Sequence, residues 1–400
     1  MKKIILILFI ALTTSAFGQK VENLALTPPL GWNSWNTFAT DINEDLIKET
    51  VDAIVESGLK DAGYDYVVLD DGWMARQRDE NGKLYGDPEK FPSGMKALGD
   101  YIHSKGLKFG IYNCAGNKTC AGYPGSRGHE FIDAATYASW GVDYLKYDWC
   151  NTEKLNAEGA YMTMRDALYA TGRPIVFSIC EWGDNKPWEW GEKHGHLWRV
   201  TGDIINCWDC EIGHGSWSSW GIWKIINMRK NIRKYSGPGH WNDFDMMEVG
   251  NGMTEAEDRT HFTMWALLAS PLIMGNDVRN LDDATLKTLS NKEVIAVNQD
   301  SLGIQGLRFS NENDIEIWIK PLTNGEWALA FVNMSEQPKI LKFDWLRHKM
   351  GDDLNQRFLD FKKETYSIRD LYGHKIIGNT TTELNAEIKS HDVLFIKLEK

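Results

Sequence analysis

One pattern repeats along the first 278 residues of the chain. An apolar run rich in β-branched or aromatic residues ends in polar residues, and a stretch with helical periodicity follows. The pattern occurs eight times, at 28–35, 64–73, 107–116, 142–151, 173–183, 196–204, 240–250 and 269–278. Parallel strands that are buried on both faces read as continuous apolar runs, and a crossover helix joins each to the next. Eight such units predict an α/β fold, a (β/α)₈ TIM barrel. A doubly wound open sheet is the rival, but no G-x-G-x-x-G motif follows the first strand.

The segment 41–60 is typical of the predicted helices. Its apolar residues, among them Ile47 and Val51, fall on one helical face. Asp41 and Glu44 have the spacing of a capping box, which would start the helix.

After about residue 303 the pattern changes to alternation of apolar and polar residues. Four runs show it, at 314–322, 326–334, 339–345 and 391–400, with a turn signal, "TNGE", after the first. Alternation with short turns is typical of antiparallel strands with one buried face. We therefore expect a catalytic barrel over 19–303 and a C-terminal antiparallel β-sandwich over 304–400, with a structural role.

The first 18 residues have the features of a secretory signal peptide. Two lysines precede an apolar run from Ile4 to Leu12, and the small residues Ala16 and Gly18 stand before Gln19. The run is shorter than the roughly 20 residues that a membrane span needs, and no later stretch approaches that length. We expect a protein exported to the periplasm or the medium, with no membrane span.

The charge balance limits the partners. The formal net charge is −12, which argues against nucleic acid and against anionic membranes, since both need a basic face. The chain also has 18 tryptophans. Their rings are good platforms for the C–H faces of sugars, although burial in the core is the more usual role for any single one.

Charged residues gather where the predicted barrel strands end. Carboxylates converging on one mouth repel one another unless they bind a cation, hydrogen-bond a polyhydroxyl ligand or divide into acid and base. No histidine joins the set at ligand spacing, so we predict a sugar site without metal or cofactor, and a polyol-binding metalloenzyme is the alternative. The set comprises Asp70, Asp71, Lys146, Asp148, Glu181, Arg199, Asp203, Asp243 and Asp245.

The stretch "YLKYDWCN" (144–151) holds two of these charges. Lys146 and Asp148 are two residues apart and fall on the same side of a strand. They form either a structural ion pair or part of a catalytic pair. Hydrolysis of a glycoside needs two carboxyl groups across the scissile bond, and Asp148 and Asp203 could face each other across the mouth.

Seven motifs in order resemble glycoside hydrolase family 27, the retaining α-galactosidases and α-N-acetylgalactosaminidases. They are "LGWNSW", "LDDGW", "GIYNCAGNKTCAGYPGS", "YLKYDWCN", "SICEWG", "WRVTGDI" and "NDFDMMEVGN". The resemblance runs from about residue 25 into the C-terminal sandwich. It implies an exo-acting α-galactosidase that hydrolyses terminal α-D-galactosyl residues of oligosaccharides or glycoconjugates.

The resemblance also implies a role for each site residue. Asp148 matches the nucleophile and Asp203 the acid/base. We expect Lys146 to keep Asp148 ionised, and we expect Asp203, in an apolar setting rich in tryptophan, to favour its protonated form. Substrate-binding positions match Trp35, Asp70, Asp71, Tyr112, Cys120, Lys146, Cys180, Glu181, Trp182, Arg199, Asp245 and Met246.

The six cysteines divide by the same resemblance. Family members bridge the positions of Cys120 and Cys150, and exported proteins can keep such a bridge. Cys180 has no matching partner and reads as a thiol in the pocket. Cys207 and Cys210 form a lone C-x-x-C, for which a local disulfide and two free thiols both stay open.

Specificity within the family depends on the loop after the fifth strand. Cys180, Glu181 and Trp182 give this chain the bulky version, which should clash with an N-acetyl group and so favours galactose over N-acetylgalactosamine. A β-L-arabinopyranosidase stays open as an alternative. A non-catalytic sugar-binding protein on the same fold would be expected to lack Asp148 or Asp203, and both are present.

Overall fold

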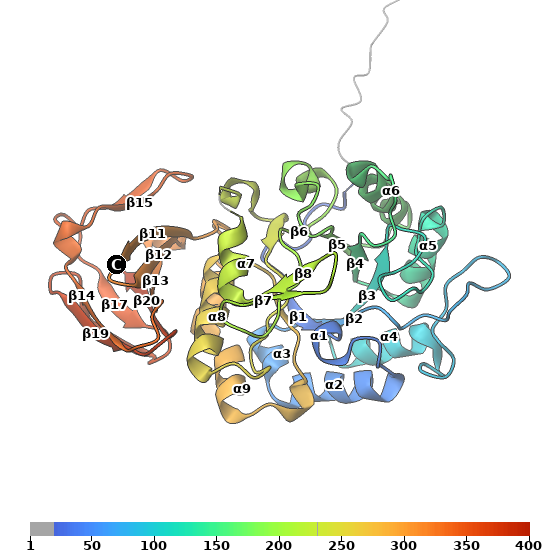
Figure 1. Cartoon of the computed structure of the whole chain (residues 1–400), viewed down its shortest axis with the longest axis horizontal. Coiled ribbons are helices and arrows are strands. Elements are labelled where there is room, and N and C mark those ends of the chain that lie inside the picture. Colours follow the sequence, from blue (N-terminus) through green and yellow to red (C-terminus); the bar gives the residue numbers. More distant parts are fainter. Residues whose placement is uncertain (1–19, 230) are drawn as a thin grey trace, which may run out of the picture.

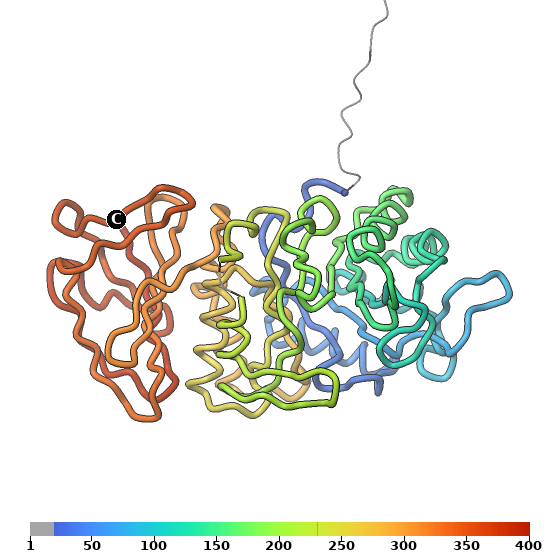
Figure 2. Tube along the Cα trace, turned by 45° about the horizontal axis from the view of Figure 1, so that its top comes forward, coloured from blue at the N-terminus to red at the C-terminus, as the bar shows by residue number. Residues whose placement is uncertain are grey.

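The computed structural model describes residues 20–229 and 231–400. The predicted signal peptide, residues 1–18, lies outside these ranges. Figure 1 shows a barrel ringed by helices and, beside it, a domain built of strands. Figure 2 shows the strand-built domain as a separate lobe at one end of the long axis. No helix within the described ranges is both long and apolar enough to cross a bilayer.

Eight strands form the barrel, and each lies inside a segment predicted from the sequence. Neighbouring strands pair in parallel in the order β10-β1-β2-β3-β4-β5-β6-β9. A parallel bridge between Met247 and Met274 joins the two ends of this order, which closes the sheet. The barrel is confirmed, and the open sheet is wrong. The strands are β1 (Leu30–Asn33), β2 (Tyr66–Leu69), β3 (Lys108–Cys114), β4 (Tyr144–Asp148), β5 (Val176–Cys180), β6 (Leu197–Arg199), β9 (Trp241–Asp243) and β10 (Leu272–Met274).

Helices surround the barrel and connect its strands (Figure 1). They are α1 (Trp35–Phe38), α2 (Glu44–Glu56), α3 (Leu59–Ala62), α4 (Gly94–Ser104), α5 (Glu130–Trp140), α6 (Ala157–Ala170), α7 (Ile222–Met228), α8 (Glu255–Leu267), α9 (Asp283–Leu289) and α10 (Lys292–Asn298). Short 3₁₀ turns lie at Pro187–Glu189, Gly191–Lys193, Arg233–Tyr235, Val278–Asn280, Thr323–Gly325 and Trp345–Arg347.

Helix α2 buries the predicted apolar face but starts differently from the prediction. Its N-cap is Asn43, whose side chain accepts a hydrogen bond from the Leu46 amide. The predicted capping box between Asp41 and Glu44 is therefore wrong. Asn is as good an N-cap as Asp, and the Glu44 carboxylate instead accepts a hydrogen bond from the Ser93 amide.

A small hairpin between β6 and α7 was not predicted. Its antiparallel strands are β7 (Glu211–Gly213) and β8 (Ser218–Trp220). Most of the side chains in this segment are exposed, so neither face of the hairpin needs to be apolar. The segment therefore lacks the alternation of apolar and polar residues that marks longer strands. In Figure 1 the hairpin is drawn across the barrel, close to α7 and β1.

The C-terminal domain is the predicted antiparallel sandwich. A six-stranded sheet has the order β11-β12-β13-β20-β17-β18, and the pairs β14-β19 and β15-β16 complete the domain around a separate apolar core. The strands are β11 (Leu307–Glu312), β12 (Ile315–Pro321), β13 (Trp327–Asn333), β14 (Lys339–Phe343), β15 (Met350–Asp352), β16 (Arg357–Leu359), β17 (Ser367–Asp370), β18 (Lys375–Asn379), β19 (Leu384–Ile388) and β20 (Val393–Glu399).

The sandwich packs on the barrel through a continuous apolar core. Trp318 and Phe395 of the sandwich belong to the same buried cluster as the barrel strands and helices. Polar contacts add to it, since Arg259 of α8 pairs with Asp392 at 2.7 Å. Burial of this kind fixes the two domains relative to each other.

Candidate active site

A cavity lies inside the barrel at the carboxyl ends of its strands. Its walls come from β1, β2, β4, β5, β6 and β10, and from residues at and just after the end of β9. This is the end at which enzymes with this fold place their active sites. The lining residues are Asn33, Val68, Tyr144, Lys146, Ser178, Cys180, Arg199, Asp243, Asp245, Met246 and Ile273. Lys146, Cys180, Arg199, Asp245 and Met246 were predicted from the sequence to contact substrate.

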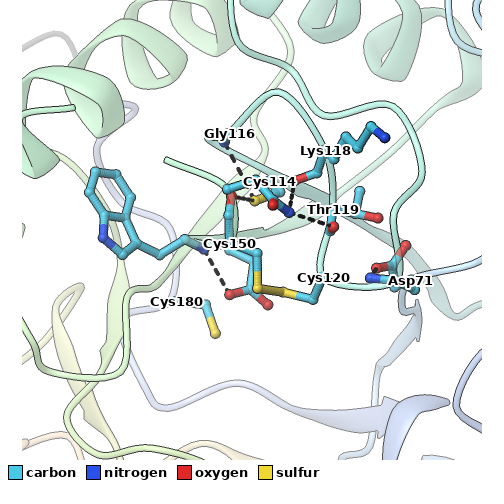
Figure 3. Close-up of a disulfide and its surroundings, with 12 residues drawn as sticks. Asp71, Cys114, Gly116, Lys118, Thr119, Cys120, Cys150 and Cys180 are labelled. Atoms are coloured by element: carbon cyan, nitrogen blue, oxygen red, sulfur yellow. Dashed lines mark hydrogen bonds between the residues drawn. A yellow bond between two sulfur atoms is a disulfide. The ribbon is translucent and has the colours of Figure 1, made fainter. Parts of the chain in front are cut away.

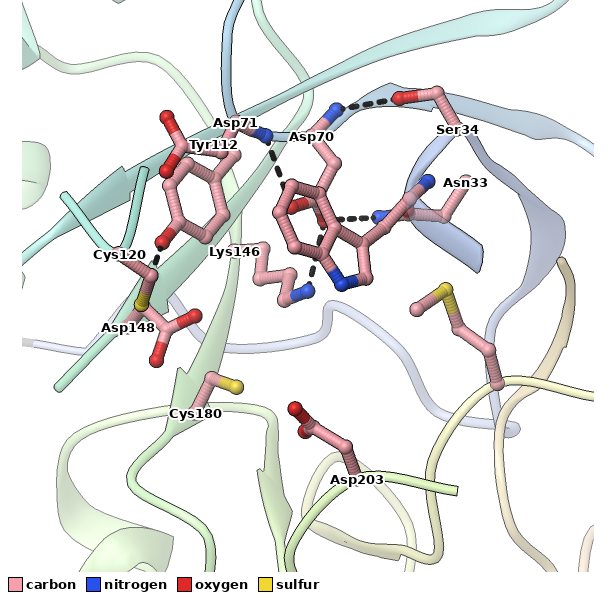
Figure 4. A network of polar contacts seen from close by, with 12 residues as sticks. Asn33, Ser34, Asp70, Asp71, Tyr112, Cys120, Lys146, Asp148, Cys180 and Asp203 are labelled. Carbon is pink, nitrogen blue, oxygen red and sulfur yellow. Dashed lines mark hydrogen bonds and ion pairs between the residues drawn. The ribbon is translucent and has the colours of Figure 1, made fainter. Parts of the chain in front are cut away.

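Asp70 anchors one wall of the site. Its Oδ2 atom accepts hydrogen bonds from Lys146 Nζ at 2.7 Å and from Asn33 Nδ2 at 2.8 Å, as Figure 4 shows. Its amide donates to Ser34 Oγ at 3.0 Å. β1 is next to β2 in the barrel, and only β3 separates β2 from β4. The carboxyl ends of these three strands therefore lie close together. The charge of Asp70 raises the pKa of Lys146 against the lowering effect of burial, so Lys146 is a cation at every pH of interest.

Asp148 ends β4 and is only 6 % exposed. Its Oδ1 atom accepts a hydrogen bond from the Trp149 amide at 2.7 Å. Among the described residues no protein group donates to Oδ2. Burial raises the pKa of Asp148 to about 7, whereas the charge of Lys146 and the Trp149 amide act to lower it. The carboxylate is therefore held by one oxygen, in surroundings that make it basic.

Asp203 lies in the loop after β6 and is paired with Arg199. The Arg199 Nη2 atom is 3.1 Å from Asp203 Oδ1 and 2.6 Å from Asp245 Oδ2, and the arginine itself is buried. The Asp203 side chain is 39 % exposed. Figure 4 shows Asp148, Lys146, Cys180 and Asp203 around one space. The charge of Asp203 adds to the effect of burial in raising the pKa of Asp148.

One expectation about charge needs correction, and one alternative is excluded. Asp203 does not lie in an apolar, tryptophan-rich setting, because Arg199 pairs with it and solvent reaches it. The sequence-based expectation considered the apolar and tryptophan residues around Asp203 and did not pair it with Arg199, which is four residues before it at the end of β6. Lys146 does not form an ion pair with Asp148 either. It pairs with Asp70 and acts on Asp148 only through its charge.

Asp71 and the predicted disulfide shape the loop after β3. Asp71 Oδ2 accepts a hydrogen bond from the Ala121 amide at 2.8 Å, and burial raises its pKa to about 6. The Cys120–Cys150 disulfide is present, as predicted, and ties this loop to the residues that follow Asp148 (Figure 3). The Tyr112 hydroxyl donates to Cys120 Sγ at 3.3 Å. The bridge therefore braces the side of the site on which Asp148 lies.

The loop after β5 begins at the cavity wall. Cys180 is a buried free thiol opposite Asp148 in the strand register. Glu181 is fully buried, and its Oε2 atom accepts hydrogen bonds from the amide and the side chain of Asn185 at 2.6 and 2.7 Å. Trp182 has a positive φ of 61°. Glu181 thus holds the loop in shape, whereas Cys180 lines the cavity directly.

The remaining predicted residues lie around the same end of the barrel. Asp245 follows β9 with a positive φ of 84°, and its carboxylate also accepts hydrogen bonds from the amides of Ile204 and Met246, both at 2.8 Å. Burial raises the pKa of Asp245 to about 6 against the opposing charge of Arg199. Trp35 starts α1, and its amide donates to Asn33 Oδ1 at 2.8 Å.

Sequence reasoning missed several lining residues. Asn33, Tyr144 and Ser178 point inward from strand positions that read simply as part of apolar runs. Cys114 is a buried thiol paired in register with Asp148 on the other side from Cys180. A sequence signal existed for Asn33 alone, because it is a polar residue at the end of a predicted strand.

One group of three potential metal ligands is close together in the described part of the chain. It contains Cys120, Asp148 and Cys150. The two sulfur atoms are bonded to each other, so they are not thiolate ligands. Cys207 and Cys210 are also joined in a disulfide, which settles the question that their spacing left open.

Two family models and several known proteins are similar to this chain over most of its length. A family model described as alpha galactosidase A matches residues 27–300, and one for the alpha galactosidase C-terminal beta sandwich domain matches residues 312–398. Alpha-galactosidase A of Cellvibrio japonicus is 54% identical over 386 residues, which cover 96% of this chain and 95% of that protein. Alpha-galactosidase of Cyamopsis tetragonoloba is 45% identical, over 92% and 85% of the two chains. The crystal structure of alpha-galactosidase I from Mortierella vinacea superposes with a TM-score of 0.87 at 36% identity and covers 94% of this chain and 98% of that one.

Proposed function

The chain belongs to the alpha galactosidase A family and is an α-galactosidase, and we propose that it removes terminal α-D-galactosyl residues by a retaining double displacement. Asp148 is the nucleophile and Asp203 the general acid/base. One observation carries these assignments. The two carboxylates face one space but differ in exposure, Asp148 being buried at the strand end and Asp203 lying on the side that solvent reaches.

In the first step Asp148 attacks the anomeric carbon. The Trp149 amide holds Oδ1, so Oδ2 is the oxygen that can form the bond. Partial desolvation makes this carboxylate a better nucleophile than one in water. Lys146 supplies the positive charge that allows it to ionise in the buried site, and the product is a β-linked galactosyl-enzyme.

Asp203 protonates the departing oxygen in the same step. Asp203 and Asp148 face the same space, so a glycosidic oxygen bound between them lies within reach of the Asp203 carboxyl group. In the second step Asp203 is a carboxylate beside Arg199, the state needed to take a proton from water. Solvent reaches this residue from outside, so the incoming water needs no separate channel.

The galactosyl hydroxyls have donors and acceptors on opposite sides of the cavity. Asp70 and Lys146 form one polar pair, and Arg199 and Asp245 form the other. Each pair is already hydrogen-bonded before substrate arrives, which limits the reorganisation needed on binding. Cys180 and Met246 supply apolar wall between them.

A panel of aryl substrates tests the sugar specificity. We expect turnover of the α-galactoside to exceed that of the α-N-acetylgalactosaminide, because the Cys180–Trp182 loop fills the space beside the 2-hydroxyl group. The β-L-arabinopyranoside, which lacks only the C6 hydroxymethyl group, should be the second substrate. Proton NMR during early turnover should show α-galactose. Initial β-galactose would contradict the nucleophile assignment.

We also propose that the protein is exported and acts on oligosaccharides or glycoconjugates outside the cytoplasm. The sequence of residues 1–18 supports export. Two disulfides support it as well, since such bonds persist in oxidising compartments. Mass spectrometry of the protein recovered from the cell exterior should give an N-terminus at residue 19.

A further inference from the structure

The chemistry of the proposed reaction places the leaving group. A general acid must lie within hydrogen-bond reach of the glycosidic oxygen that it protonates. The aglycone therefore leaves the cavity on the side of Asp203, where the chain that follows Asp203 begins. This step rests on the proposed acid/base role of Asp203.

The hairpin β7–β8 begins eight residues after Asp203, and the end of β8 returns to it. The Trp220 amide donates to the Asp203 carbonyl oxygen at 2.9 Å, and the Ile205 amide donates to the Trp220 carbonyl oxygen at 2.9 Å. Trp220 also packs so closely over Gly202 that a Cβ there would lie 2.2 Å from its ring. With a strand rise of about 3.3 Å per residue, Trp217 lies roughly 10 Å further along the hairpin.

Trp217 is exposed and oriented at the tip of this hairpin. It is 52 % exposed, although a tryptophan normally buries most of its surface. The His214 ring stacks on it with centroids 4.1 Å apart and planes 26° apart, and His214 is itself bound to Ser219 Oγ at 2.9 Å. The tight turn between them uses Gly215 at a φ of 88°. One face of the indole is thus covered and held, and solvent reaches the other.

The base of the hairpin is fixed to both domains. The Cys207–Cys210 disulfide closes it, and Trp208 between them stacks on Trp223 of α7 and on His391 of the sandwich, with centroids 5.1 and 4.4 Å apart. An aromatic group held this way loses little conformational entropy when a ligand binds.

We propose that Trp217 is a binding platform for the aglycone of longer α-galactosides, on which sugar units beyond the first one after the scissile bond stack. Sugar rings present C–H faces to aromatic rings, and the surrounding Ser216 and Ser218 offer hydroxyl groups for hydrogen bonds. The platform would favour oligosaccharides and polysaccharides over small galactosides.

The test is a ratio of kcat/KM values, stachyose to 4-nitrophenyl α-galactoside. Trp217→Ala should lower this ratio about 3- to 10-fold, mainly through KM for stachyose. Melibiose, whose aglycone is a single sugar, should show a smaller fall. Trp217→Tyr should restore most of the ratio. Phe358→Ala is the matched control, since Phe358 is 70 % exposed on the sandwich, and its ratio should equal that of the unmodified protein.

A ratio in Trp217→Ala equal to that of the control would overturn the proposal, and so would failure of Trp217→Tyr to restore it. If Trp217→Ala lowers the melting temperature, His214→Ala becomes the deciding variant. It keeps the indole of Trp217 but removes the ring that supports it, so it should lower the kcat/KM ratio by a smaller factor than Trp217→Ala does. The Asp203 assignment has its own measurement, azide rescue of Asp203→Ala. A lowered ratio without azide rescue would retain the platform and reject the acid/base role.

Discussion

Asp148 and Asp203 have surroundings that fit different tasks. Asp148 is buried, with one oxygen held by a backbone amide and the other free of protein donors within the described residues. Asp203 is partly exposed and paired with Arg199. A nucleophile benefits from desolvation, and an acid/base must exchange protons with substrate and water. The proposed roles of Asp148 and Asp203 therefore follow from the different exposure of the two side chains and not from their distances to Lys146.

The raised pKa of Asp148 predicts the acid limb of the pH profile. Asp148, the proposed nucleophile, must be ionised, and its pKa is raised from 3.8 to about 7. Activity is therefore present above this pKa and lost as the pH falls through it. In 4-nitrophenyl α-galactoside hydrolysis, kcat/KM should decline between about pH 7 and 6 rather than near pH 4.

Lys146→Met supplies the control for that profile. Removing the cation removes an effect that lowers the pKa of Asp148, so the acid limb should move to higher pH while kcat/KM falls overall. An acid limb near pH 4 in the unmodified protein, or one that does not move in Lys146→Met, would contradict the account of the nucleophile.

The sequence predicted which residues meet at the site but not their pairing. Asp70, Lys146 and Asp148 stand at strand ends, and period-two geometry is enough to bring them to one mouth. Whether Lys146 pairs with Asp70 or Asp148 depends on how far its side chain reaches across the sheet, which no spacing encodes. The Arg199–Asp203 pair was missed although the two residues are only four apart, because the sequence does not show that the loop after β6 folds back toward the Arg199 side chain.

At the scale of elements, two disulfides brace opposite sides of the mouth. Cys120–Cys150 ties the loop after β3 to the residues after Asp148, the proposed nucleophile, which form the nucleophile loop. Cys207–Cys210 closes the base of the hairpin after Asp203, the proposed acid/base. The eight barrel strands were predictable because each is a buried apolar run bounded by polar residues. The hairpin was not, because its fold depends on contacts with Asp203 and α7 rather than on its own pattern.

Removing each bridge should have a different effect. Chain-entropy arguments give about 3.5 kcal/mol for the 30-residue separation of Cys120 and Cys150 and about 2 kcal/mol for the 3-residue separation of Cys207 and Cys210. Cys120→Ser/Cys150→Ser should lower the melting temperature more than Cys207→Ser/Cys210→Ser does, and it should also lower kcat on the aryl galactoside.

Cys207→Ser/Cys210→Ser is the matched control for that experiment. It removes one bridge of the same chemistry but should affect stachyose more than the aryl galactoside. Equal losses of stability and of aryl-galactoside turnover in the two double variants would show that the Cys120–Cys150 bridge has no particular effect on the nucleophile loop.

At the scale of the whole molecule, Lys320 joins the two domains. It lies on β12 of the sandwich, fully buried, and its ammonium donates to the carbonyl oxygens of Ala266 at 3.2 Å and Val297 at 2.7 Å, at the ends of α8 and α10. Cations are favoured at helix C-termini, but burial opposes the charge and lowers the pKa of Lys320 to about 7.

This interface predicts a pH dependence of stability. Between about pH 7 and 10 the unfolded chain keeps the Lys320 proton and the folded protein loses it, so the contribution of Lys320 to stability rises with pH in this window. Lys320→Met removes the amine that binds this proton. The melting temperature of the unmodified protein minus that of Lys320→Met should therefore increase from pH 7 to pH 9.5 in differential scanning calorimetry, and a constant difference would contradict a shifted pKa.

The central claim is that Asp148 forms the covalent bond and Asp203 moves the proton, and azide separates the two roles in one measurement. With an activated aryl α-galactoside, azide should replace the missing nucleophile in Asp148→Gly and invert the configuration, which gives β-galactosyl azide. In Asp203→Ala it should instead displace Asp148 from the β-linked galactosyl-enzyme and give α-galactosyl azide. NMR of the isolated galactosyl azides identifies the anomeric configuration directly. The account predicts opposite anomers from the two variants, and the same anomer from both, or an α-azide from Asp148→Gly, would contradict it.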